Sequence, residues 1–425
     1  MLSISPEAQV LLGTSVYTRG SLKDNPRADF ATLATTVLFP YVKWLINKSL
    51  ALGLTRLYFI ARDGYVLKEI ADIIIEQDNI ENLKTHYIYG SRDAWRMPCV
   101  AKFEDMSFVF SQFINRTTIS YIAERYGITT NELQKFLKGS FKKENKILTV
   151  DNLTTIKSML NTPEFVEFIL NKNKEKRELL IEYLRQNIDF SDENFAFVDL
   201  TCSGTTNYLL SNLINDNFND TEYKLKFFNI RISKNLKDSN FMQFDFLQLH
   251  FEPIIIEIFA RAPHGLTIGY ENKEGKIEPI LNEAEKFENF KDYIEAIKFQ
   301  TKLLADTLNT NSNLNLYKFS IMLTDSIKSC STKDTAKYFS SVEFSSVGTS
   351  KEFSTNKDKF NLIDILNIFY FKKIRPDQKQ IDFVLKNSNI LVQSTANFFT
   401  THPKLNIPQI KHSLKHTKIA IKSNF

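Results

Sequence analysis

Hydroxyl side chains, a glycine and an acid are gathered in the segment Asp199–Thr206, which reads Asp-Leu-Thr-Cys-Ser-Gly-Thr-Thr. It lies between an apolar run and a helical pattern, so its end should begin a helix, where unpaired backbone N–H groups and the helix dipole stabilise a phosphate. Asp199 would accept hydrogen bonds from sugar hydroxyls. The predicted phosphate contacts are Thr201, Ser203, Gly204, Thr205 and Thr206. Taken alone, the segment is equally consistent with a capped helix whose hydroxyls are structural.

Two further polar turns carry cations. Arg62-Asp63-Gly64 and Ser91-Arg92 each follow a short apolar run. A guanidinium can hold two phosphate oxygens in a planar, bidentate contact, so Arg62, Gly64, Ser91 and Arg92 are predicted to hold a pyrophosphate. Either arginine alone could instead form a surface pair with an acid. That interpretation loses weight if both turns lie at the same edge of one sheet.

The elements that should position these turns alternate between strands and helices. Strands are predicted over Arg56–Ala61, Thr85–Gly90, Phe195–Val198, Lys224–Ile232 and Phe241–Leu249. Apolar residues at helical spacing follow the first and third of them. This alternation predicts an α/β fold with a mainly parallel sheet and helices on both faces. Ligands of such sheets bind beyond the carboxyl ends of the strands, so we expect the three turns to meet at one site.

The chain divides into four regions on the same grounds. Residues 1–103 and 191–281 should form the two halves of the α/β core, the second half carrying an acceptor-side segment. Residues 104–190 are rich in amphipathic patterns and should form a large helical insertion, and residues 282–425 a helical C-terminal region. A buried helix with a kink at Pro40 is predicted over Ala31–Leu52.

The three turns resemble the pyrophosphate loop, the second strand and the phosphoribosyl-pyrophosphate loop of type I phosphoribosyltransferases. More narrowly, Leu57-Tyr-Phe-Ile-Ala-Arg-Asp-Gly64 and Tyr89-Gly-Ser-Arg-Asp-Ala-Trp95 resemble a bacterial polysaccharide-synthesis family that is often fused to a haloacid-dehalogenase-type (HAD-type) phosphatase. That family is similar to the enzymes that place ribofuranose in capsules and O-antigens. The resemblance covers roughly Ala31–Ile280.

The segment Glu257-Ile-Phe-Ala-Arg-Ala-Pro-His264-Gly265 also looks like this family, whose members carry a Glu, an Ala-Pro pair and a Gly-Tyr pair such as Gly269-Tyr270. Glu257 lies in an apolar run, where an acid usually has a specific reason to be. It would bind the acceptor or act as general base, with His264 as a weaker candidate for the same role. A structural pair with Arg261 at i,i+4 explains Glu257 equally well.

The resemblance implies transfer of 5-phosphoribosyl from phosphoribosyl pyrophosphate (PRPP) to a hydroxyl of a glycan or lipid-linked glycan in capsule or O-antigen synthesis, with release of pyrophosphate. Asp63 or Glu257 would take the acceptor's proton, and Mg²⁺ would be held mainly by the substrate and water. Two departures stand out: Val198 precedes a single Asp199 where phosphoribosyltransferases often have two acids, and Thr201-Cys202 replaces a common glycine. Since no Asp-x-Asp-x-Thr motif follows a predicted strand, a separate HAD-type phosphatase would have to remove the 5-phosphate.

Three alternatives remain open. A nucleotide-sugar glycosyltransferase would usually carry an Asp-x-Asp metal ligand after a strand, for which Asp245-Phe-Leu is a poor substitute. A DNA-binding helix-turn-helix is suggested by the spacing of Ile119–Leu133, with Gly127 in the turn. Its second helix would present Glu132 to the groove and little cationic surface, so we expect no nucleic-acid partner. A protein that binds phosphate or nucleic acid without catalysis is the remaining possibility.

Composition sets the outer limits. The formal net charge is only +5, too small to indicate a nucleic-acid-binding protein. Five lysines without acids, Lys404, Lys411, Lys415, Lys418 and Lys422, give at most a peripheral membrane contact. The three cysteines show no paired spacing, which fits a reducing compartment. Neither a signal peptide nor a long apolar stretch is visible, so a cytoplasmic location, possibly at the inner face of the membrane, is predicted.

Overall fold

The computed structural model of the chain describes residues 6–102, 105–106, 117–141, 143–144, 146, 148–202, 204–218, 224–232, 241–247, 254–308, 361–365 and 388–401. The chain forms two compact units, Met1–Asp325 and Ser326–Phe425. In the second unit, the short helix α15 (Leu362–Ile365) packs against α17 (Ile390–Thr401). The five lysines of the C-terminal segment lie outside the described residues.

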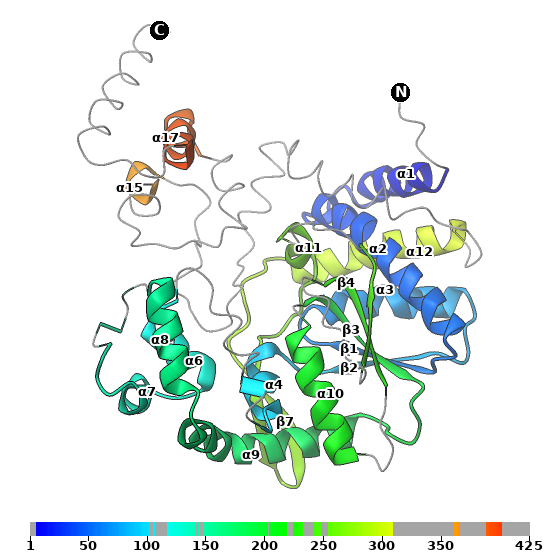
Figure 1. Cartoon of the computed structure of the whole chain (residues 1–425). Helices are drawn as coiled ribbons and strands as arrows, with labels where there is room; N and C mark the ends of the chain where they lie inside the picture. Colours follow the sequence, from blue (N-terminus) through cyan, green and yellow to red (C-terminus); the bar gives the residue numbers. More distant parts are fainter. Residues whose placement is uncertain are drawn as a thin grey trace, which may run out of the picture. The chain divides into compact units, whose positions relative to one another are not determined.

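Within the described residues, five parallel strands form the sheet of the first unit (Figure 1). In chain order they are β1 (Arg56–Ile60), β2 (Lys84–Ile88), β3 (Phe195–Cys202), β4 (Leu225–Ile232) and β5 (Phe241–Asp245). Their spatial order is β2-β1-β3-β4-β5, and every neighbouring pair is parallel. The predicted α/β class and parallel sheet are therefore confirmed.

Helices cover both faces of this sheet (Figure 1). On one face lie α1 (Pro6–Ser21), α2 (Ala28–Ala51), α3 (Gly64–Gln77), α11 (Ile254–Phe259) and α12 (Phe290–Thr307). On the other lie α4 (Arg92–Cys99), α9 (Pro163–Asn187) and α10 (Thr205–Phe218). Side chains alternate across a strand, so Phe195 and Phe197 of β3 point to the same face and bury against Leu209 and Leu213 of α10.

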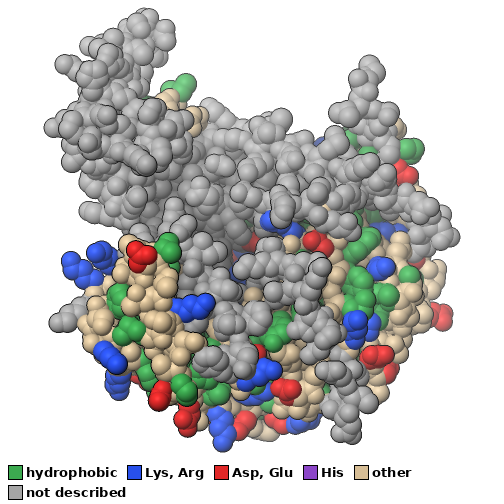
Figure 2. Space-filling view, in the orientation of Figure 1, with side chains coloured by type: hydrophobic (Ala, Val, Ile, Leu, Met, Phe, Trp, Pro, Cys, Tyr) green, Lys and Arg blue, Asp and Glu red, His purple; other side chains and the backbone are tan. Residues whose placement is uncertain are grey.

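The helical insertion contains α6 (Ile119–Tyr126), α7 (Thr130–Phe136), α8 (Val150–Leu160) and α9. As the helix-turn-helix spacing predicts, α6 ends at Gly127 in the left-handed conformation, and a capping box at Thr129 begins α7. Glu132 of α7 pairs with Lys172 of α9 at 2.7 Å, so this acid is engaged within the insertion. Figure 2 shows the Lys and Arg side chains of the described residues interspersed with Asp and Glu on the visible face.

An antiparallel hairpin that the sequence did not suggest follows the α/β core. It consists of β6 (Thr267–Lys273) and β7 (Lys276–Leu281), joined at Gly275 with φ +87°. The hairpin packs on α4 and α9. Its Tyr270 hydroxyl donates to the Tyr89 carbonyl at 2.8 Å and accepts from Trp95 Nε1 at 2.6 Å, so the hairpin fixes the turn between β2 and α4.

The central strand is longer than predicted. The sequence places its end at Val198, whereas β3 continues to Cys202 because Asp199, Thr201 and Cys202 pair with β4. Pairing with β1 ends earlier, at Phe59 opposite Val198. Asp199 is thus on a strand that extends beyond β1. The polar residues of this stretch resemble a loop sequence. They can still form a strand because their backbone pairs with β4 on one edge.

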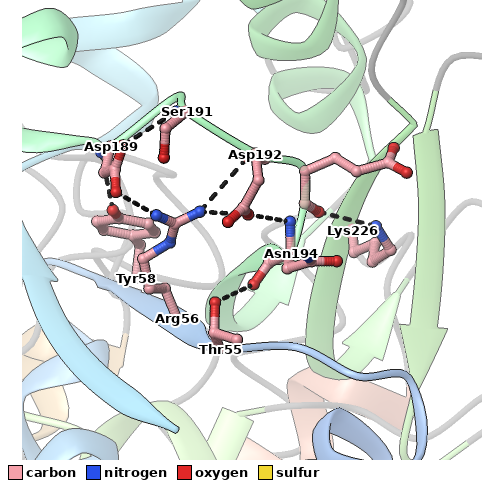
Figure 3. A network of polar contacts seen from close by, with 9 residues as sticks. Thr55, Arg56, Tyr58, Asp189, Ser191, Asp192, Asn194 and Lys226 are labelled. Carbon is pink, nitrogen blue, oxygen red and sulfur yellow. Dashed lines mark hydrogen bonds and ion pairs between the residues drawn. The ribbon is translucent and has the colours of Figure 1, made fainter. Parts of the chain in front are cut away.

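The amino ends of β1 and β3 are joined by a polar network (Figure 3). Arg56 of β1 forms ion pairs with Asp189 and Asp192 in the segment that leads from α9 into β3. The Tyr58 hydroxyl accepts from Asp189 N at 3.0 Å. These charges satisfy one another, which is typical of a structural network. They lie at the opposite end of the strands from the three predicted turns.

Gly90→Ala is expected to destabilise the fold by roughly 1–3 kcal/mol. A Cβ at residue 90 would overlap the Trp95 indole, and that ring is held by its bond to Tyr270. Denaturant unfolding of the full chain would measure the effect. Gly13→Ala is the control, because nothing lies within 4 Å of its added Cβ in α1, and it should be neutral or slightly stabilising. Equal stability of the two variants would contradict this packing.

No helix among the described residues combines the length and apolarity needed to cross a membrane.

Candidate functional site

The first two predicted turns lie side by side at the carboxyl edge of the sheet. Directly after β1, Ala61 N donates to the carbonyl of Ile88, the last residue of β2, at 2.8 Å. Arg62-Asp63-Gly64 begins α3, and Ser91-Arg92 begins α4. The Gly64 backbone packs against Phe59, and an added Cβ would be 2.8 Å from the Phe59 carbonyl carbon. Gly64 thus permits α3 to start close to β1.

Asp63 and Asp199 are half-buried acids that act on each other electrostatically at this edge. Burial raises the pKa of Asp63 to about 6, with Arg62 acting against the shift and Glu257 adding to it. Burial and then the charge of Asp63 raise the pKa of Asp199 to about 7. Glu257 contributes to both shifts, and Arg92 opposes both. The structure therefore brings the three predicted acids and Arg92 into one electrostatic cluster.

Neither aspartate is used to cap a helix. Asp63 occupies the N-cap position of α3 but accepts no side-chain capping bond. Asp199 accepts one hydrogen bond from Leu200 N at 2.7 Å, and its backbone carbonyl accepts from the Tyr41 hydroxyl at 3.0 Å. Tyr41 belongs to the buried helix α2 and so fixes the backbone of β3 at this residue. No sequence signal distinguishes Tyr41, because it lies in a continuous apolar pattern.

Glu257 reaches the site from α11. Its carboxylate accepts a hydrogen bond from the Thr201 hydroxyl at 2.7 Å. The hydroxyl of Thr201, a residue predicted to contact phosphate, thereby positions Glu257 against β3. Arg261, the predicted i,i+4 partner of Glu257, forms an ion pair with Glu285.

Arg62 and Arg261 share Glu285. Arg62 Nη1 lies 2.7 Å from Glu285 Oε2, and Arg261 also contacts that oxygen. Burial lowers the pKa of Arg261; for Arg62, burial acts in the same direction but Glu285 and Asp63 outweigh it and raise the pKa. Both guanidiniums thus remain charged beside the acids. Glu285 lies after the hairpin and belongs to none of the sequence motifs. Its ion pairs with Arg62 and Arg261 show that it is part of the site.

Ser91 has a structural part in the second turn. Its hydroxyl donates to the Thr267 carbonyl at 2.6 Å and accepts from Asp93 N and Ala94 N at 3.1 and 3.0 Å. It therefore caps α4 and joins it to β6. Arg92 is the first residue of that helix.

The third turn is described except for Ser203, which lies outside the described residues. Gly204 has φ +80°, a left-handed conformation that favours glycine. Thr205 is buried and begins α10, and Thr206 is half-buried. The predicted strand-to-helix turn with a glycine before the helix is therefore present.

His264 borders the cluster on the β2 side. Its Nε2 lies 2.8 Å from the Tyr87 hydroxyl, and its Nδ1 lies 2.8 Å from the Gly265 carbonyl oxygen. The rings of Tyr87 and Tyr89 pack against it. Burial lowers the pKa of His264, and Arg62 acts in the same direction. The lowered pKa favours a neutral His264 imidazole, which lies against two tyrosine rings.

Two clefts are lined by Pro263, the residue before this histidine. One, of about 510 Å³, is lined by Pro263, Glu285 and Phe287 among others. The other, of about 560 Å³, is lined by Tyr65, Pro263 and Lys298 among others. Since they share Pro263 and the first reaches Glu285, the partner of Arg62, they give bulky molecules an approach to this side of the cluster.

Within the described residues, no group of three or more His, Cys, Asp or Glu is arranged to hold a metal ion. Comparison of the chain with known protein families gives no match, and a search of curated proteins gives none either. The charges and contacts of the site therefore carry the functional argument.

Proposed function

We propose that this chain is a phosphoribosyltransferase of the type I fold that transfers 5-phosphoribosyl from PRPP to a hydroxyl of a glycan acceptor and releases pyrophosphate. The single observation that carries this proposal is the joining of two kinds of group at one sheet edge. Arginines suited to phosphate lie there beside half-buried acids suited to sugar hydroxyls. A donor that is both a sugar and a diphosphate needs both.

In this proposal the phosphate groups are divided between the turns. Arg62 and Arg92 stabilise the charge that develops on the leaving pyrophosphate. The 5-phosphate binds where Gly204, Thr205 and Thr206 begin α10, at the positive end of the helix dipole. Asp199, on β3 before the third turn, accepts hydrogen bonds from the ribose hydroxyls.

The proton of the acceptor hydroxyl needs a base. Asp63, whose pKa is raised to about 6, is ionised for the most part at neutral pH and basic enough to accept a proton. Glu257 is the alternative base, held by Thr201. Direct displacement of pyrophosphate by the acceptor oxygen would invert the anomeric carbon and give a β-ribofuranoside.

Mg²⁺ fits this site as an ion brought in by the substrate. The charge of Asp63 raises the cost of ionising Asp199, which a divalent cation would relieve. The diphosphate and water would provide most of its ligands, and the ion would neutralise charge on the leaving group. Asp63 and Asp199 are the residues of this chain that would share it.

The acceptor would approach through the clefts around Pro263, beside His264. As part of the same proposal, the product belongs to capsule or O-antigen synthesis on a glycan or lipid-linked glycan at the inner face of the membrane. A separate HAD-type phosphatase would then remove the 5-phosphate.

Calorimetric titration of the full chain with PRPP and Mg²⁺ tests the donor. We expect PRPP to bind at least ten-fold more tightly than ribose 5-phosphate, because only PRPP occupies all three turns. Equal affinities, or no binding of PRPP, would refute the proposal. Appearance of pyrophosphate on addition of candidate glycans would then identify the acceptor.

A further inference from the structure

Three arginines gather on helices α4 and α6 next to the acid cluster. Arg92 and Arg96 are one helical turn apart on α4 and therefore share one side of that helix. Arg125, in the last turn of α6, lies 3.7 Å from Asp93 of α4 and donates to the Tyr121 hydroxyl at 2.8 Å. Asp93 thus lies within this group of arginines and pairs with Arg125.

Arg96 is the unusual member of the three. Its side chain is only 3% exposed, and among the residues that the structure describes its Nε has no hydrogen-bond partner. Burial, and then the positive charges of Arg125 and Arg92, lower the pKa of Arg96 to about 9. Burying a cation beside two others is costly unless an anion compensates it.

Two other buried arginines of the first unit show what that compensation can be. Arg56 has Asp189 and Asp192, and Arg261 has Glu285. In the described residues, Arg96 takes no part in such a pair, since Asp93 pairs with Arg125. Arg96 thus lacks the close carboxylate that Arg56 and Arg261 have, and Asp93 acts on it only electrostatically.

We propose that Arg92, Arg96 and Arg125 bind a phosphate group of a substrate. The guanidinium group offers forked N–H donors that match phosphate oxygens, and Arg92 begins α4, where the helix dipole also favours an anion. Arg92 acts electrostatically on both Asp63 and Asp199, so the phosphate would lie beside the reacting sugar. It belongs either to the diphosphate of the donor or to a phosphorylated acceptor.

This inference goes beyond the proposed function and does not need sugar transfer to be correct, because a phosphate can bind without it. The test uses inorganic pyrophosphate and N-acetylglucosamine 1-phosphate as probes, titrated into the full chain by calorimetry. Arg96→Gln is expected to weaken binding of at least one probe by roughly 10- to 100-fold, which is the usual effect of losing a charge-assisted hydrogen bond. Arg185→Gln is the control, since Arg185 is exposed and pairs with Glu182 on α9; it should bind both probes as the wild type does.

The two probes distinguish the source of the phosphate. Loss confined to pyrophosphate assigns the site to the donor, and loss confined to the sugar phosphate assigns it to the acceptor. Unchanged binding of both probes by Arg96→Gln, or no binding by the wild type, overturns the inference. PRPP binding that survives Arg96→Gln would still leave the proposed function intact.

Thermal unfolding separates binding from a structural role. Without ligand, Arg96→Gln should melt at the same temperature as the wild type or higher, because it removes an uncompensated buried charge. A melting temperature several degrees lower, with unchanged probe affinity, would show that Arg96 is structural. Arg125→Gln provides a second variant should Arg96→Gln fail to fold, and it must show the same loss of affinity.

Discussion

Asp199→Asn is expected to lower kcat for sugar transfer by roughly 10²- to 10³-fold, the usual effect of removing one preorganised electrostatic contact to a transition state. In the proposed reaction the anomeric carbon becomes positive as pyrophosphate leaves, and the Asp199 carboxylate binds the ribose hydroxyls beside it. Asparagine keeps the acceptor oxygen for Leu200 N but not the charge. Steady-state release of pyrophosphate at saturating donor would measure the loss, and unaltered kcat would exclude a role for Asp199.

The same variant should be more stable than the wild type at pH 8. The pKa of Asp199 is raised to about 7 from its ordinary 3.8, so between about pH 4 and pH 7 the folded state binds more protons than the unfolded state. Stability therefore falls as pH rises through this window, by at most about 4 kcal/mol for this group. Asparagine removes that penalty, so the gain in melting temperature should be present at pH 8 and absent near pH 4.

Asp189→Asn is the matched control for that measurement. A hydrogen bond from Ser191 N, with the charge of Arg56 as a further cause, lowers the pKa of Asp189, and the residue lies in the network at the amino ends of the strands (Figure 3). Its replacement should reduce stability at pH 8 and leave kcat unchanged. If Asp199→Asn is also less stable at pH 8, burial of the Asp199 carboxylate does not destabilise the folded state.

Arg92→Gln should weaken PRPP binding by roughly 10- to 100-fold, equivalent to about 1.5–3 kcal/mol for a charge-assisted hydrogen bond. The reason is that Arg92 interacts electrostatically both with Asp199 and with Arg96. Glutamine keeps a similar length and polarity without the charge. Calorimetry with PRPP and saturating Mg²⁺ would show the effect directly.

Arg185→Gln again serves as the control for a lost positive charge. It should bind PRPP like the wild type, because Arg185 is exposed on α9 and pairs with Glu182 within its own helix. If Arg92→Gln and Arg185→Gln bind equally well, the loss of net charge has no effect and Arg92 does not contact the donor.

The periodic parts of the fold were predictable from the sequence. Strands β1 and β4 and helix α2 have long apolar patterns, and their predicted bounds agree with the structure to within a few residues. The two turns that carry Arg62 and Arg92 were also predictable, since strand-turn-helix boundaries are marked by Gly, Ser and Asp. These short-range signals locate the edge of the sheet at which the acids meet.

The contacts made over long sequence distances were not predictable. Glu285 pairs with Arg62 more than two hundred positions earlier in the chain, and nothing near either residue indicates this partner. The hairpin was missed because β6 has an exposed isoleucine, a glycine and charged residues. These interrupt the alternation of apolar and polar residues that marks a strand. Asp199 was assigned to a loop because strand pairing on one edge leaves no mark in the sequence.

Helix α12 has a consequence for how the chain is made. It packs between α1, α2 and α3, its Tyr293 hydroxyl donates to the Phe259 carbonyl at 2.6 Å, and the segment just before it supplies Glu285. The ribosome delivers the strands and α2 long before Thr307, the last residue of α12. During synthesis, the surfaces of α1, α2 and α3 that α12 covers therefore stay open to chaperones until α12 has emerged from the exit tunnel.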